Sequence, residues 1–74
     1  MPTNNERAGR GRVLLQIYAE NFGDPMDDTA NVTDILADLM HFAHRQSEPG
    51  LNFNRRLEMA KMHFEEELLE EVSR

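Results

Sequence analysis

The sequence predicts an all-α protein, a small three-helix domain, and three observations lead to this. Apolar residues recur at helical spacing in three separate segments. Glycine and proline interrupt the pattern twice, around residues 23–25 and 49–50. The central segment has the most strongly amphipathic pattern of the three. We therefore expect a single helical domain over residues 10–74.

A chain this short is expected to need stabilisation beyond that of its own hydrophobic core. A domain of 74 residues buries only ~60% of the surface that its unfolded chain exposes. The sequence contains no cysteine, so disulfides cannot compensate. Oligomerisation is a usual alternative, and we expect a homodimer.

The N-terminal segment is expected to be a disordered arm over residues 1–9, because it is polar and glycine-containing. A first helix is expected over about residues 10–22, with Val13, Leu14 and Ile17 on one face. Gly23 is placed as the residue that ends it in a left-handed conformation.

The central helix, expected over residues 32–46, has the widest apolar face. Its apolar residues span an arc of roughly 160°, against the ~100° stripe of an ordinary surface helix. They are Val32, Ile35, Leu36, Leu39, Met40, Phe42 and Ala43. Asn31 or Thr33 is expected to cap its N-terminus. The arc predicts that this helix is the hub of the fold, covered on two sides.

A third helix is expected over residues 53–72, after a turn at Ser47, Glu48, Pro49 and Gly50 and an N-cap at Asn52. Its core stripe is predicted to be Phe53, Leu57, Ala60, Phe64 and Leu68. Met62 and Leu69 fall on the opposite face, where single exposed apolar residues are common and where methionine also suits an interface.

The charge balance opposes binding to phosphate. Fourteen acidic residues and eight basic residues give a formal charge of -6. No segment has the ~20 apolar residues of a membrane span, and the N-terminus has no signal-peptide pattern. These features favour a cytoplasmic protein without a membrane partner or a cofactor.

The outward face of the central helix is a candidate partner-binding site. Asp34, Asp38, His41 and Arg45 lie along one line of this helix. The simplest interpretation is a solvated face that follows the helix dipole. The competing interpretation is a site, with Asp38, His41 and His44 as weak candidates for metal ligands. No established metal signature is present, so we predict no metal.

Catalysis is not expected from the residue types present. The only serines, Ser47 and Ser73, lie in a turn and beside the last residue. A metal-dependent helical hydrolase remains one alternative, because some such enzymes hold Mg²⁺ with repeated carboxylates. The glutamates here scatter around the third helix, however, and do not converge.

Nucleic-acid binding is a second alternative. Arg10 and Arg12 form an Arg-Gly-Arg motif like those of flexible arms that enter the minor groove. The second and third helices would then form a helix-turn-helix that presents Arg55 and Arg56. The acidic residues farther along the third helix would meet phosphate unfavourably.

The acidic end of the third helix also has a protein-binding interpretation. Carboxylates can compete for a basic surface by occupying the positions of phosphates. The residues concerned are Glu65, Glu66 and Glu70, with their neighbours Glu67 and Glu71.

One resemblance covers about residues 31–67. The run from Thr33 to His41, the Gly50-Leu51-Asn52-Phe53 turn and the segment from Ala60 to Phe64 are similar to a pattern in short uncharacterised bacterial and phage helical proteins. Those proteins share a T-D-h-h-A-D-h-h-H helix followed by a G-L-[DN]-F turn. The resemblance carries no assigned activity and implies a small accessory protein of a phage or mobile element.

Together these features predict a small acidic, non-enzymatic protein-interaction module. Its concrete version is an inhibitor of a host defence or nucleic-acid enzyme. The residues expected to bind the partner are Asp34, Asp38, His41, Arg45, Glu65, Glu66 and Glu70.

Overall fold

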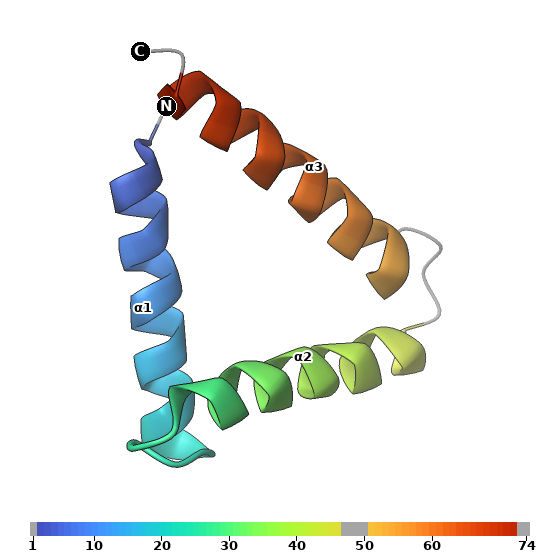
Figure 1. The fold of residues 1–74 in the computed structure, drawn as a ribbon. Coiled ribbons are helices and arrows are strands. Elements are labelled where there is room, and N and C mark those ends of the chain that lie inside the picture. Colours follow the sequence, from blue (N-terminus) through green and yellow to red (C-terminus); the bar gives the residue numbers. More distant parts are fainter. Residues whose placement is uncertain (1, 47–50, 73–74) are drawn as a thin grey trace.

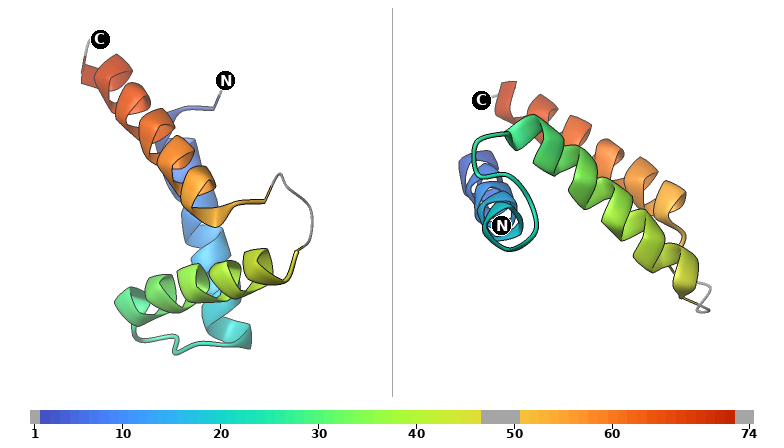
Figure 2. Two further views of the ribbon diagram at one scale, coloured as in Figure 1. Left: turned by 90° about the vertical axis from the view of Figure 1, so that its right-hand side faces the viewer. Right: turned by 90° about the horizontal axis from the view of Figure 1, so that it is seen from below.

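The protein consists of three α-helices that meet near their ends. The computed structural model describes residues 2–46 and 51–72. Its helices are α1 (Asn4–Asn21), α2 (Asp28–Arg45) and α3 (Phe53–Val72). They form the sides of an open triangle, with the start of α1 close to the end of α3 (Figures 1 and 2). The predicted all-α, three-helix class is confirmed, and the turn predicted over residues 47–50 lies outside the described residues.

Helix α1 begins earlier than the sequence indicated. Thr3 caps it by accepting a 3.1 Å hydrogen bond from the backbone N–H of Glu6. Asn4 and Arg7 in its first turns also bind α3, as described below. The prediction of a disordered arm over residues 1–9 is therefore wrong from Asn4 onward, because capping and tertiary contacts offset the low helix propensity of Gly9.

The connection between α1 and α2 is the most tightly built part of the protein. The side chain of Asn31 is 1% exposed, and its Oδ1 accepts a 3.0 Å hydrogen bond from the Asp24 N–H. Its Nδ2 donates to the Asp24 carbonyl at 2.7 Å. Asn31 thus pairs with the backbone of Asp24 as a second peptide group would, and this fixes the turn that connects α1 to α2.

Capping residues set the bounds of α2 and α3. Asp27, not Asn31 or Thr33, caps α2 by accepting from the Ala30 N–H at 3.0 Å. Asn31 therefore lies inside the helix. The cap predicted for α3 is confirmed, because the Asn52 side chain accepts from the Arg55 N–H at 3.1 Å.

Gly23 is required for close approach and not for its backbone conformation. None of the described glycines has a positive φ, so the predicted left-handed ending of α1 is wrong. A Cβ at Gly23 would lie 2.1 Å from Asn31 Oδ1, far inside van der Waals contact. The absence of a side chain at Gly23 makes room for the buried amide.

The single chain has almost no hydrophobic core. Ala19, at 7% exposure, is the one buried apolar residue among those described. Five residues of the predicted apolar face of α2 are exposed to between 40% and 57%: Val32, Leu36, Leu39, Met40 and Phe42. Ile35 and Ala43 are half-buried. The prediction that α2 is a hub covered on two sides is wrong for the single chain, because the helices meet near their ends instead of packing along their lengths (Figure 1).

The overall dimensions show the same openness. The radius of gyration is 14.4 Å, against about 11 Å for a compact domain of this length. The accessible surface is 6706 Å², against roughly 4,700 Å² for a compact monomer of 8.6 kDa. The chain therefore exposes roughly 2,000 Å² more than a self-contained fold would.

The corner makes a paired prediction about glycine substitutions. Gly23→Ala should lower the free energy of unfolding by about 2–3 kcal/mol, because the new methyl group displaces the Asn31 amide from Asp24. Gly11→Ala should raise it by about 0.5–1 kcal/mol, because Gly11 is helical and its Cβ would meet nothing within 4 Å. Urea titrations followed by circular dichroism measure both. Equal effects of the two substitutions would show that the corner does not govern stability.

Candidate protein-interaction surface

The predicted line of charged residues on α2 is partly occupied within the chain. The Tyr18 hydroxyl of α1 donates a 2.6 Å hydrogen bond to Asp38 Oδ2. Arg45 Nη1 donates to the carbonyl of His41 in its own helix at 3.4 Å. Asp38 therefore faces α1 and helps to hold the corner between the two helices.

Tyr18 responds electrostatically to this arrangement. Its hydrogen bond to Asp38, its partial burial and the negative charges of Asp38 and Asp34 raise the pKa of Tyr18 to about 12 from its ordinary value of 10.0. Ionised Tyr18 would lose the donated hydrogen bond and place two anions side by side. The protonated phenol is therefore the form that binds α2.

The metal candidates do not converge. On the helix, His41 lies on the same line as Asp38, whereas His44 lies about 60° round the helix from His41. Across residues 2–46 and 51–72, no three His, Asp or Glu residues are close enough together to hold a metal ion. The metal proposal is not supported by any arrangement of these described side chains.

The acidic end of α3 closes the triangle against α1. Glu67 Oε2 forms an ion pair with Arg7 Nε at 3.0 Å. Asn4 Nδ2 donates to the Glu67 carbonyl at 3.1 Å and to Glu71 Oε2 at 2.7 Å. Asn4 and Arg7 lie in the segment that the sequence predicts to be a disordered arm, so neither contact was predicted.

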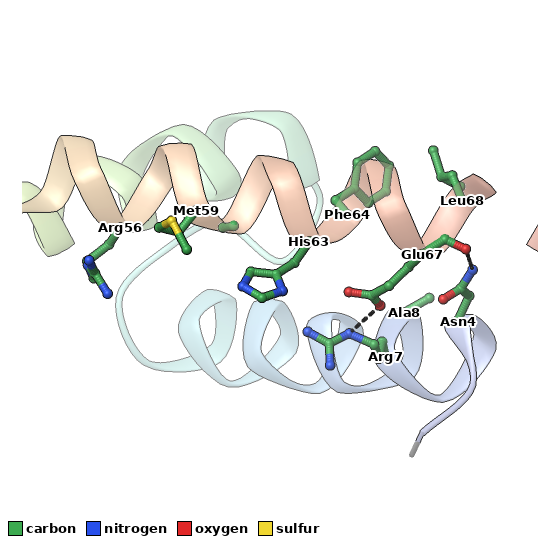
Figure 3. A pocket seen from close by; sticks show the side chains of 10 residues that line it. Asn4, Arg7, Ala8, Arg56, Met59, His63, Phe64, Glu67 and Leu68 are labelled. Carbon is green, nitrogen blue, oxygen red and sulfur yellow. Dashed lines mark hydrogen bonds and ion pairs between the residues drawn. The ribbon is translucent and has the colours of Figure 1, made fainter. Parts of the chain in front are cut away.

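A crevice of about 590 Å³ lies between α1 and α3. Figure 3 shows the Arg7–Glu67 pair bridging the two helices beside His63, with Arg56 and Met59 farther along α3. Met59 is half-buried here, unlike the exposed Met62 and Leu69 on another side of α3. This crevice identifies the side of α3 that faces α1.

A second hollow of about 530 Å³ adjoins the first and is predominantly acidic. Its lining includes His63, the start of α1 and four glutamates of α3. The glutamates are Glu66, Glu67, Glu70 and Glu71. Glu67 and Glu71 bind α1, whereas no hydrogen bond or ion pair engages Glu66 or Glu70 in the described part of the chain. These two carboxylates lie one helical turn apart and repel each other.

The opposite face of α3 continues the acidic surface. Helical periodicity places Glu65 on the side away from the crevice, beside the half-exposed Met62. Glu65 likewise has no partner among the described residues. A surface of free carboxylates with an adaptable methionine suits a positively charged protein segment.

The basic residues predicted to contact DNA are divided between α1 and α3 and do not all share one helix face. Arg10 and Arg12 are inside α1 and point to different sides of it, so they are not part of a flexible arm. Arg56 lines the crevice that faces α1. The structure places Glu66 and Glu70 in one hollow, leaves Glu65 on the other side of α3, and leaves the basic candidates dispersed.

Comparisons with known proteins identify no relative. No match was found among models of protein families, curated protein sequences or solved structures. None of the helices, over the residues that the structure describes, is long and apolar enough to cross a membrane.

The contact between Tyr18 and Asp38 can be tested directly, because Tyr18 is the chain's one tyrosine and tryptophan is absent. In an absorbance titration, the ionisation midpoint should lie near 12 in the wild type and fall toward 10.0 in Asp38→Asn. Asp34→Asn, which removes only a distant charge, should shift it less. Since the folded state raises this pKa, the stabilisation is complete below pH 10.0 and is lost as the pH rises through about 12. A wild-type midpoint equal to that of free tyrosine would refute the contact.

Proposed function

We propose that the protein is a non-enzymatic protein-interaction module that uses the acidic surface of α3 to bind a basic segment of a partner protein. The observation that carries the proposal is the acidic hollow, in which Glu66 and Glu70 have no hydrogen-bond or ion-pair partner among residues 2–46 and 51–72. Bringing an arginine or lysine between them would relieve their mutual repulsion and form charge-assisted hydrogen bonds.

The kind of partner follows from this chemistry. A surface that binds phosphate presents arginine and lysine, and a spaced set of carboxylates is complementary to it. An inhibitor of a host defence or nucleic-acid enzyme is the version of the proposal that also agrees with the resemblance to phage and bacterial accessory proteins. The exposed charges of α2, Asp34 and Arg45, lie on another side of the triangle and would serve as a secondary contact.

The proposal can be tested with two variants of equal charge change. Glu66→Gln/Glu70→Gln removes the free carboxylates of the hollow, whereas Glu20→Gln/Glu58→Gln removes two exposed carboxylates elsewhere. Tagged wild-type chain should recover a partner from cells of its natural source, and purified components then give the affinity. The first variant should weaken binding at least ~10-fold, because each charge-assisted hydrogen bond contributes about 1.5–3 kcal/mol. The second should bind as the wild type does.

Two results would contradict the proposal. One is a partner that binds both variants equally, because the hollow would then have no part in recognition. The other is a salt-sensitive shift of random duplex DNA at micromolar protein, because phosphate binding would favour the regulator with Arg10, Arg12, Arg55 and Arg56.

A further inference from the structure

The exposed apolar face of α2 has the spacing of a helix-pairing seam. Four residues follow one another at intervals of four, three and four positions: Val32, Leu36, Leu39 and Ala43. This is the a/d spacing with which helices pack along their length. The first three are exposed to 47%, 40% and 48%, whereas Ala43 is half-buried, so the seam is largely uncovered within the chain.

The seam is free of charge along its length. On the helical wheel, Ile35, Met40 and Phe42 flank it, and no charged side chain lies on or beside it between Thr29 and Ala43. The acidic residues Asp34 and Asp38 lie on the other side of the helix. A second chain of the same net charge can therefore approach this face without like charges meeting at the contact.

The ends of α2 are electrostatically complementary to each other. Its N-terminal end carries Asp27 and Asp28, and its last turn carries His44 and Arg45. In an antiparallel pair, the acidic end of one helix lies beside the basic end of the other, and the two helix dipoles oppose. A parallel pair would instead place Asp28 beside Asp28.

The surface area agrees with a second copy as the occupant. Each chain exposes roughly 2,000 Å² more than a compact monomer of its mass. A dimer that covered all of this excess surface would bury about 4,000 Å² in total, which is the upper bound for this chain and lies within the ~2,000–5,000 Å² of obligate homodimers. Because a single chain buries so few apolar residues, the contacts between the two copies would supply packing that folding itself requires.

We propose that two copies of this chain form an obligate dimer through antiparallel pairing of α2. The two-fold axis passes between Leu36 and Leu39, so that Leu36 packs against Leu39 of the other copy and Val32 lies beside Ala43 of the other copy. The seam is on α2 and the acidic surface is on α3, so the dimer leaves that surface free to bind a partner. The dimer does not depend on the partner bound there.

The absence of cysteine allows a direct test of orientation and register. Val32→Cys and Ala43→Cys are made separately in the full-length chain, and each is oxidised alone and as a mixture. In the proposed dimer, two Val32 positions are about 16 Å apart along the helix axes, too far for a disulfide, which needs Cα atoms within about 7 Å. Each variant alone should stay uncross-linked, and the mixture should give the disulfide-linked heterodimer.

Alongside the cross-linking, the mass of the protein in solution is measured across a dilution series. The wild type should have twice the 8.6 kDa chain mass. Leu39→Glu should raise the dissociation constant at least ~100-fold, because the charge would be buried twice at the centre of the seam. Ile17→Glu, at a similarly exposed position on α1 (52% against 48%), should change it by no more than about threefold.

Each contrary result overturns the dimer. A monomer at high concentration with a cooperative melt would show that the single chain suffices. Variants that cross-link with themselves would indicate a parallel pair, and a dimer that gives no cross-link would use another face. None of these results bears on the Glu66→Gln/Glu70→Gln comparison, so the dimer and the partner-binding surface can fail separately.

Discussion

The arrangement of the helices depends on the buried amide of Asn31. Its oxygen accepts from the Asp24 N–H, and its nitrogen donates to the Asp24 carbonyl, which also accepts from the Asp27 N–H in the turn between α1 and α2. Because Gly23 has no side chain, the amide of Asn31 fits beside it. With the turn held in this way, Tyr18 reaches Asp38 and the direction of α2 relative to α1 is set.

Polar contacts also close the opposite corner of the triangle. Arg7 pairs with Glu67, and Asn4 binds the backbone and a carboxylate of α3. Exposed ion pairs each contribute little, and the chain has almost no apolar core to add to them. The corners therefore define the shape of the protein, but much of the packing energy that stabilises ordinary domains is absent from the single chain. This is the physical reason for expecting a second polypeptide against its apolar faces.

The local elements were predictable because their signals lie close together in sequence. The spacing of Phe53, Leu57 and Phe64 predicts α3, and Asn52 caps it as expected. The early start of α1 was not predictable in this way, because Asn4 and Arg7 are held by residues sixty or more positions away. Asn31 was assigned to a cap because its residue type is common there, whereas its actual partner is the backbone of Asp24 in the preceding turn.

The candidate site was likewise predictable from the sequence only in part. Sequence alone established the helical class, the acidic charge and the group of glutamates in α3, because composition and helical periodicity are local properties. Only the tertiary structure separated Glu67 and Glu71, which bind α1, from Glu66 and Glu70, which remain free. It likewise assigned Asp38 to Tyr18, and it left the wide apolar arc of α2 uncovered. These outcomes depend on how the helix ends meet, and the corner formed by Gly23, Asp24 and Asn31 decides that geometry.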